Sequence, residues 1–344
     1  MPATVRVRIA VTAAVVAALL AGPAARAEWL PVCGGWESYA VFDVLFMQRD
    51  NTTNDEPLVL NGDTLATAIG TPDLQFPVAP GIRTAYGQHG PDGVGWEFGY
   101  LGVYGMFADA DASGDGNLEI APPLSGAVAG LVGASAARAT YGAVLNSAEV
   151  NVLLTERCLH RPRSSGYAAE CHSGTFTLDW LAGFRWAGLD EQAALAFGDG
   201  PGTLVTGYAV RTSSNLFGGQ LGVRGRADWD AWAVEGWAKA ALAGSVLAQS
   251  QDAIVDSITG DVYRPARGSR TDTPGGIFDV GATLVYRLSD TWGLRFGYSM
   301  LWLTGVALAP DQFDFSTDTT AGATLDANKT LWLGGANLGL EARW

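Results

Sequence analysis

Residues 291–305, TWGLRFGYSMLWLTG, are the clearest indication of the fold, because their side chains alternate strictly in character. Their apolar side carries Trp292, Leu294, Phe296, Tyr298, Met300 and Trp302, and their other side carries Arg295, Gly297 and Ser299. A period of two is typical of a β-strand whose faces meet different surroundings. At about 3.3 Å per residue and a tilt of roughly 40°, this apolar face covers about 25 Å, the height of a membrane barrel's apolar band.

The same pattern recurs from Glu37 to Trp344, for example in residues 174–187 and 275–288. A two-layer sandwich also alternates, so the length of the apolar face, with aromatic residues at its ends, distinguishes the two architectures. We therefore predict an all-β, transmembrane, antiparallel up-and-down β-barrel of about ten strands, within a range of roughly eight to twelve. The predicted strands are 37–49, 81–88, 94–107, 140–155, 174–187, 214–227, 231–246, 275–288, 291–305 and 329–344.

The connections between these strands alternate in length, which predicts short periplasmic turns and long outer loops. The long ones are 50–80, 108–139, 188–213, 247–274 and 306–328, and the short ones are 89–93, 228–230 and 289–290. The connection 156–173 is intermediate. Loop 188–213 could instead hide a strand pair at 192–198 and 203–211, which would give twelve strands. Residues 125–139, rich in Ala and Gly, are interpreted as outer loop in preference to a short helix over the mouth.

The N-terminus has the features of a secretory signal peptide. Arg6 and Arg8 precede an apolar run that ends at Leu20, and Ala25-Arg26-Ala27 forms an A-x-A cleavage site. The run is too short to cross a bilayer as a helix, which needs roughly 20 residues. We predict a signal peptide at 1–27, a periplasmic segment at 28–36 and a barrel at 37–344, located in the bacterial cell outer membrane.

The charge of the chain excludes one class of partner. Without residues 1–27 the chain has 18 basic and 35 acidic residues, a net charge of -17, which argues against nucleic acid. The expected partners are outer-membrane lipid, the barrel-assembly machinery, and small solutes or envelope polymers. The C-terminal stretch 337–344, ending in Trp344, resembles the signal that the assembly machinery recognises.

Several stretches resemble the putative beta-barrel porin type 7 family of planctomycete-type bacteria. These are residues 80–83, 146–151 and 183–186, the stretch NLFGGQLG at 215–222, and residues 237–240 and 296–299. The first predicted strand carries less tryptophan than is usual in that family. The resemblance implies an outer-membrane barrel, and it assigns no activity.

The inward faces of the predicted strands bring many charges together. The predicted lumen-facing charged residues are Asp43, Arg83, Glu97, Glu149, Asp179, Arg185, Arg224, Arg226, Glu235, Lys239, Asp279, Arg287 and Arg295, with Glu341 and Arg343 on the same faces. In a ten-stranded cylinder such charges pair across a lumen little wider than the side chains. The preferred interpretation is an ion-pair network that closes the cylinder, and the alternative is a narrow charged channel.

Other candidate sites are less specific. The predicted aromatic girdle consists of Trp96, Trp186, Trp292, Trp302, Trp332 and Trp344. Cys158 and Cys171 flank one connection and are predicted to form a disulfide, although unpaired thiols remain an alternative, and Cys33 has no assigned role. A calcium site is a second hypothesis for loop 109–119, with the ligands Asp109, Asp111, Ser113 and Asp115, but a solvated acidic turn explains the same residues. No other cofactor is expected.

Three classes of function are compatible with this organisation. The preferred hypothesis is a porin-like or structural envelope barrel, and the alternative is a surface adhesion protein that acts through its outer loops. We do not expect an enzyme, because the three histidines, His89, His160 and His172, all fall on the predicted periplasmic side without a partner at a readable spacing.

Overall fold

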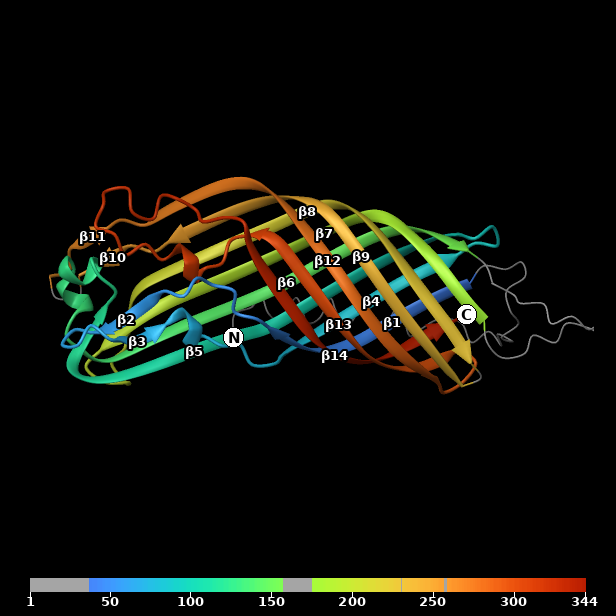
Figure 1. Ribbon diagram of the computed structural model, residues 1–344, viewed down its shortest axis with the longest axis horizontal. Coiled ribbons are helices and arrows are strands. Elements are labelled where there is room, and N and C mark those ends of the chain that lie inside the picture. Colours follow the sequence, from blue (N-terminus) through green and yellow to red (C-terminus); the bar gives the residue numbers. More distant parts are fainter. Residues whose placement is uncertain (1–36, 157–174, 230, 257–258) are drawn as a thin grey trace, which may run out of the picture.

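The computed structural model describes residues 37–156, 175–229, 231–256 and 259–344. Ten long antiparallel strands make up the barrel. They are β1 (Glu37–Arg49), β4 (Ala79–His89), β5 (Val94–Ile120), β6 (Ala134–Glu156), β7 (Thr175–Gly198), β8 (Val205–Trp229), β9 (Trp232–Gln251), β12 (Arg267–Arg287), β13 (Trp292–Val306) and β14 (Lys329–Arg343). Figure 1 shows these strands as one tilted, elongated cylinder.

Each barrel strand pairs with the barrel strands before and after it, and pairing of β1 with β14 closes the cylinder. The backbones of Ser38 and Trp344 exchange two hydrogen bonds at this junction, of 2.8 and 2.9 Å. The predicted fold class, strand number and up-and-down order are therefore confirmed. Ser38 and Trp344 lie at what we call the turn end, where β4–β5, β8–β9 and β12–β13 connect within a few residues.

The opposite end, the loop end, differs from the sequence prediction. Three of the predicted long loops, 108–139, 188–213 and 247–274, consist largely of strand, because β5 to β9 and β12 continue well beyond their predicted limits. The suspected strand pair at 192–198 and 203–211 lies within β7 and β8 and adds no strand to the barrel. Alternation persists along these extensions, but small and charged residues replace the large apolar ones that marked the predicted strands.

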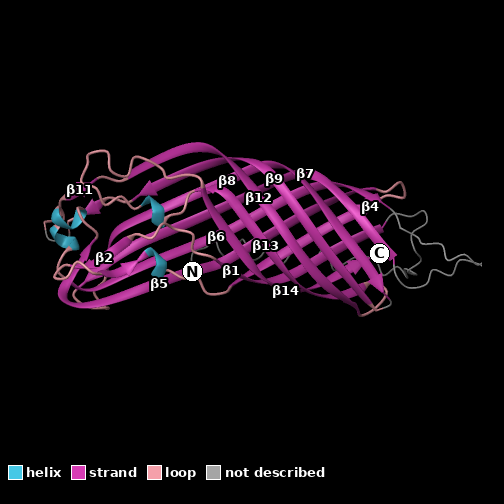
Figure 2. Cartoon of the chain, in the orientation of Figure 1, coloured by secondary structure: helices cyan, strands magenta, loops and turns pink. Residues whose placement is uncertain are grey.

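Short elements cover the loop end. A hairpin of β2 (Pro57–Asn61) and β3 (Thr67–Gly70) adds to the edge of β5, and β10 (Ile254–Val255) pairs with β11 (Val262–Arg264). The 3-10 turns are η1 (Thr71–Asp73), η2 (Leu124–Gly126), η3 (Ala129–Leu131) and η4 (Pro310–Gln312). Figure 2 shows all helical turns at this end. The segment 125–139 therefore combines two 3-10 turns with the start of β6, where we predicted loop.

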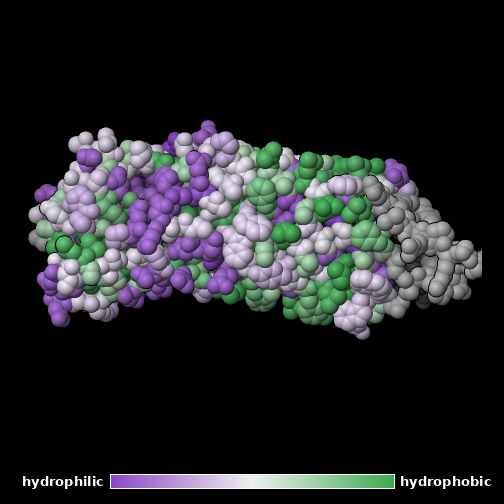
Figure 3. Space-filling view, in the orientation of Figure 1, coloured by the Kyte–Doolittle hydropathy of each residue, from purple (hydrophilic) through white to green (hydrophobic). Residues whose placement is uncertain are grey.

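The outward faces near the turn end are apolar. Phe98, Phe184, Leu221 and Phe296 are each between 44% and 69% exposed, although a globular protein would bury such residues. In Figure 3 the hydrophobic surface gathers over the half of the molecule toward the C-terminus, and the hydrophilic surface lies over the other half. We call this surface the apolar band. Among the described residues, no helix is long and apolar enough to cross a membrane.

Candidate functional site

The lumen is the candidate site, and it contains two layers of side chains. The layer near the turn end, here called the ionic layer, consists of inward-facing charged residues. Its basic members are Arg83, Arg185, Arg224, Arg226, Lys239, Arg287, Arg295 and Arg343, and its acidic members are Asp43, Glu97, Glu149, Asp179, Asp228, Glu235, Asp279 and Glu341. The layer therefore contains as many basic as acidic residues, and Glu37 adds one more carboxylate at the rim.

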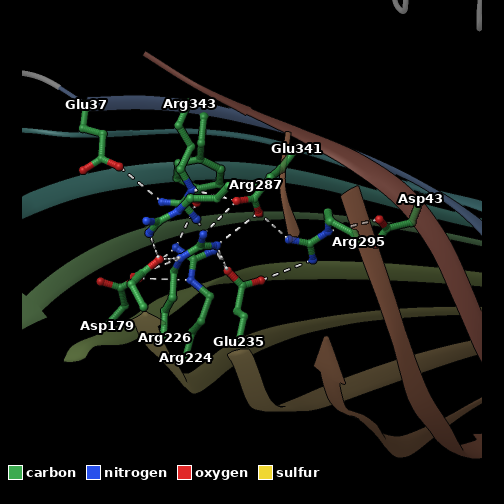
Figure 4. Close-up of polar contacts among 12 residues, drawn as sticks. Glu37, Asp43, Asp179, Arg224, Arg226, Glu235, Arg287, Arg295, Glu341 and Arg343 are labelled. Carbon is green, nitrogen blue, oxygen red and sulfur yellow. Dashed lines mark hydrogen bonds and ion pairs between the residues drawn. The ribbon is translucent and has the colours of Figure 1, made fainter. Parts of the chain in front are cut away.

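Arg295 is the most connected member of this layer. Its guanidinium contacts Asp43 at 3.1 Å, Glu341 at 2.8 Å and Glu235 at 3.3 Å, and these residues come from β13, β1, β14 and β9. Arg226 on β8 contacts Glu341 at 2.8 Å and Glu235 at 3.5 Å. Figure 4 shows Glu235 and Glu341 between Arg226 and Arg295. One shared pair of carboxylates thus joins opposite walls of the barrel.

A second group lies around Arg224. Its guanidinium contacts Glu97 on β5 at 2.5 Å and Asp179 on β7 at 2.9 Å, and it lies 5.1 Å from the ring centroid of Tyr39. The Tyr39 hydroxyl donates a hydrogen bond to Glu97, at 2.5 Å. Glu97 is 2% exposed, so its carboxylate is stabilised by these partners in place of water.

A third group connects Arg185, Glu149, Lys239 and Asp279. Arg185 contacts Asp279 at 3.1 Å across the lumen, Lys239 pairs with Glu149, and the indole of Trp237 donates to Asp279 at 2.8 Å. Trp237 fits because Gly281 faces it: a Cβ at Gly281 would lie 2.3 Å from the indole ring. The cavity left among these groups has a volume of about 70 Å³, which holds only a few water molecules.

The layer near the loop end, here called the apolar layer, fills the barrel with a conventional hydrophobic core. Fully buried wall residues such as Leu45, Leu189 and Leu303 meet residues of the inserted connections such as Leu74 and Leu308. Interiors of this kind are close-packed and have few voids larger than a water molecule. The apolar layer therefore fills the barrel between the ionic layer and the loop end.

One ion pair lies inside the apolar layer. Arg49 contacts Glu191 at 2.6 Å with both side chains 0% exposed, and Tyr141 donates to Glu191 at 2.9 Å. The backbone amide of Ala309 donates to the same carboxylate at 2.8 Å, and the Arg49 guanidinium lies 4.6 Å from the Phe76 ring centroid. Arg49 and Glu191 thus hold the connections that contain Ala309 and Phe76 against the wall.

The connection 307–328, here called the strap, enters the mouth of the barrel at the loop end (Figure 1). Gln251 donates to the carbonyl of Gln312 at 2.9 Å, and Arg264 donates to the carbonyl of Asp314 at 2.8 Å. Phe313 packs on Tyr208 with ring centroids 5.0 Å apart. Side chains of β9 and β11 therefore satisfy backbone groups of the strap that burial would otherwise leave unpaired.

All thirteen charged residues predicted to face the lumen take part in the ionic layer. The sequence prediction missed Arg49 and Glu191, although both continue the alternation that places Asp43 and Arg185 inside. Asp228, which pairs with Arg287 and Arg226, was also missed because it was assigned to a turn.

The other predicted sites divide into several cases. Of the predicted girdle, Trp96, Trp292 and Trp344 are exposed near the turn end, whereas Trp186, Trp302 and Trp332 are half-buried.

Residues 109–119 lie within β5 instead of forming a loop, and Asp111 forms an ion pair with Arg138 at 2.5 Å. Within the described ranges no group of three His, Cys, Asp or Glu could hold a metal ion, so the calcium site stays a prediction without a preformed ligand cluster. Residues 1–36, Cys158, Cys171, His160 and His172 lie outside the described residues.

Comparisons with known proteins agree with the barrel architecture. The crystal structure of the outer membrane protease OmpT from Escherichia coli is similar with a TM-score of 0.52 and 10% sequence identity, over 90% of this chain and 97% of that chain. This likeness concerns the fold alone. A major outer membrane protein from Thermus thermophilus has 12% identity and a TM-score of 0.34, over 90% and 99% of the two chains, which is too low to carry an argument. No curated protein sequence matches the chain.

The family assignment comes from the sequence. Residues 48–344 match the family model described as putative beta barrel porin-7, which covers almost all of the barrel. The match includes nine complete barrel strands and the ionic layer apart from Asp43. It agrees with the resemblance seen in the stretches 215–222 and 296–299. The chain therefore belongs to the putative beta barrel porin-7 family and is an outer-membrane β-barrel.

Proposed function

We propose that this protein is a closed structural barrel of the bacterial outer membrane that does not conduct solutes. The proposal rests on the two layers that fill the lumen in series. The ionic layer leaves a cavity of only about 70 Å³, and the apolar layer is a packed core around the buried pair of Arg49 and Glu191. In this proposal the turn end faces the periplasm, as the short turns of such barrels do, and the loop end faces outward.

An enzymatic role has little support from the described residues. The only histidine in the described ranges is His89, near the turn end, where its ring contacts Thr155 at 3.0 Å and lies 5.7 Å from the Tyr39 ring. The similar protease OmpT thus shares its fold with this chain, and the fold alone does not carry an activity. We propose that the protein is not an enzyme.

Conductance in planar bilayers tests the proposal. We expect no stepwise current from the purified protein, and none after residues 310–323 of the strap are replaced by a short Gly-Ser linker, because the ionic layer remains. A variant that combines this replacement with Arg185→Ala, Arg224→Ala and Lys239→Ala should conduct if it folds, and migration of the unheated protein on a detergent gel reports folding. Stepwise current from the unmodified protein would contradict the proposal and favour a narrow charged channel.

The extension at the loop end supports a second candidate function, surface interaction. Strands β5 to β8 continue beyond the apolar band as one sheet, and the outward faces of β5 and β7 carry exposed acids such as Asp109 and Asp190. A polar extension of this kind is suited to contact with envelope polymers or other cells. Binding of whole cells to the immobilised protein, with and without proteolytic trimming of the extension, tests this role.

A further inference from the structure

An open groove crosses the outer surface of the barrel at the loopward edge of the apolar band. Its volume is about 980 Å³, and β5, β6, β7, β8, β9 and β12 each contribute to it. Exposed residues of its lining include Phe107, Asp190, Gln192, Arg211 and Arg270, and the first four alternate with buried neighbours. At this level the inside of the barrel is filled by the strap and the apolar layer, so the groove lies on the outside.

Small residues make this surface hollow. Gly105 has a φ of +69° in a bulge of β5, and no atom lies within 4 Å of a Cβ built there. A Cβ at Gly142 would meet its nearest neighbour, an atom of Phe107, only at 3.8 Å. Ser213, Ala248 and Ser250 complete the floor with short side chains. A larger residue at Gly142 would therefore project into the hollow without a clash with the wall, whereas the φ of Gly105 restricts that position to glycine.

The groove lies where the outer surface changes from apolar to polar. On β5 the outward residues change from Phe107 to Asp109, and on β8 they change from Phe217 to Ser213 and Arg211. Because the apolar band marks the hydrocarbon core, the groove lies at the depth of the lipid headgroups on the loop side.

The lining has the chemistry of a site for a polyhydroxylated ring. Asp190 accepts hydrogen bonds, Arg211 and Arg270 donate them, Gln192 does both, and Phe107, 50% exposed, offers an apolar ring face. Arg211 is held in place by Asp252 at 2.8 Å. A volume near 980 Å³ is at the upper end of the range for ligands of several rings, and it exceeds what one phosphate group fills.

We propose that this groove binds the sugar headgroup of an outer-leaflet glycolipid, whose acyl chains lie on the adjoining apolar band. The occupant is a lipid because the groove continues directly into the lipid-facing surface at Phe107 and Phe217. The proposal depends on the membrane placement given above, but not on whether the lumen conducts, so bilayer conductance and glycolipid binding can fail separately.

Native mass spectrometry of the full-length mature barrel, titrated in detergent, tests the proposal. The probes are a lipopolysaccharide with a short sugar core, phosphatidylglycerol, and the free core oligosaccharide. We expect the lipopolysaccharide to bind about tenfold more tightly than either of the other probes, a difference that one or two well-made polar contacts supply. Equal binding of phosphatidylglycerol would indicate an ordinary lipid annulus, and equal binding of the free sugar a soluble-polymer site; either result would overturn the proposal.

Filling the groove provides the matched comparison. Gly142→Trp places an indole into the hollow, whereas Gly219→Trp, at a position with no atom within 4 Å of a built Cβ, adds the same indole to the band outside it. We expect Gly142→Trp to weaken lipopolysaccharide binding about tenfold and Gly219→Trp to leave it unchanged. Gly142→Trp binding as tightly as the unmodified barrel would overturn the assignment to this groove, and gel migration of both unheated variants shows that they fold.

Discussion

The ionic layer and the apolar layer fill the same lumen, but the distribution of charged and apolar side chains between the two faces of the wall is opposite. Around the ionic layer the barrel is apolar outside and charged inside, as the exposed Phe296 and the buried Arg295 of β13 illustrate. Around the apolar layer it is charged outside and apolar inside, as the exposed Asp190 and the buried Leu189 of β7 illustrate. The first arrangement is that of a membrane barrel and the second that of a water-soluble protein. The outer face of one continuous sheet is therefore suited to lipid at the turn end and to water at the loop end.

A bulge contributes to this change. On β5, inward residues have odd numbers up to Val103 and even numbers from Met106, because the register with β6 shifts between these two residues. Without the shift Asp109 and Asp111 would point into the apolar layer. A second shift separates Thr304 from Val306 on β13. On β5 and β13 a local irregularity of the backbone thus lies between the two layers, whereas β8, β9 and β12 keep a continuous register with one another through both.

Insertion of one alanine between Met106 and Phe107 should have the largest effect on this comparison. It moves every later residue of β5 to the opposite face, so Asp109 and Asp111 would face the apolar layer, and burying unpaired charges is prohibitive. We expect no folded barrel on an unheated detergent gel.

Gly105→Ala is the control for this insertion. It keeps the register and strains a φ of +69°, which costs about 1 kcal/mol, so this variant should fold. Folding of the insertion variant as stably as Gly105→Ala would show that the register beyond the bulge does not set the facing of the extension.

Arg224→Met tests the ionic layer. It leaves Glu97 and Asp179 buried without their main counter-charge, and loss of one partner of a buried pair costs about 3–5 kcal/mol. Arg211→Met is the matched control, because the pair of Arg211 with Asp252 is 47% and 50% exposed and is worth at most about 1 kcal/mol. Urea unfolding in detergent measures both. Similar losses for the two variants would mean that the ionic layer is solvated.

Leu303→Ala tests the apolar layer. Leu303 is 0% exposed, and deletion of such a side chain costs about 2–5 kcal/mol through lost transfer energy and a residual cavity. Leu242→Ala on the apolar band, 83% exposed, should cost less than about 1 kcal/mol. The same unfolding assay compares them. A larger loss for Leu242→Ala would indicate that the loop end is loosely packed.

Acidification should have the smallest of these effects, a local weakening of the strap at Asp314. Burial alone raises the pKa of Asp314, but hydrogen bonds from Ser316 and the amide of Gly322 outweigh it and hold the pKa below the ordinary value of 3.8. A depressed carboxyl pKa stabilises the folded form above the ordinary value, and this contribution is lost as the pH falls through the folded value. We therefore expect the strap to become sensitive to an acid-active protease only below about pH 3.8. Asp314→Asn should remove this pH dependence; an unchanged profile would exclude Asp314 as its origin.

The part of the barrel that the apolar band surrounds could be predicted from sequence, because large apolar side chains mark one face of each strand there. The thirteen charged lumen residues follow from that alternation. The loop-end extension could not be predicted in the same way, because alternation such as Asp109-Ala110-Asp111-Ala112 lacks large residues and suggests a loop. The bulge at Gly105 also changes the inward-facing residues of β5 from odd-numbered to even-numbered, and no local sequence pattern predicts this change. The partners of Arg49 depend on strands far apart in sequence, so only the closed barrel reveals them.

The junction of β1 with β14 has a consequence for biogenesis. Eleven residue pairs, from Tyr39 with Arg343 to Arg49 with Leu333, join the first strand to the last. Until β14 has left the ribosome and reached the membrane, Arg295 lacks Glu341, and both lateral edges of the sheet expose unpaired amides and carbonyls. A chain that lacks β14 therefore keeps two open strand edges that other chains can pair with, and only arrival of the last strand removes both.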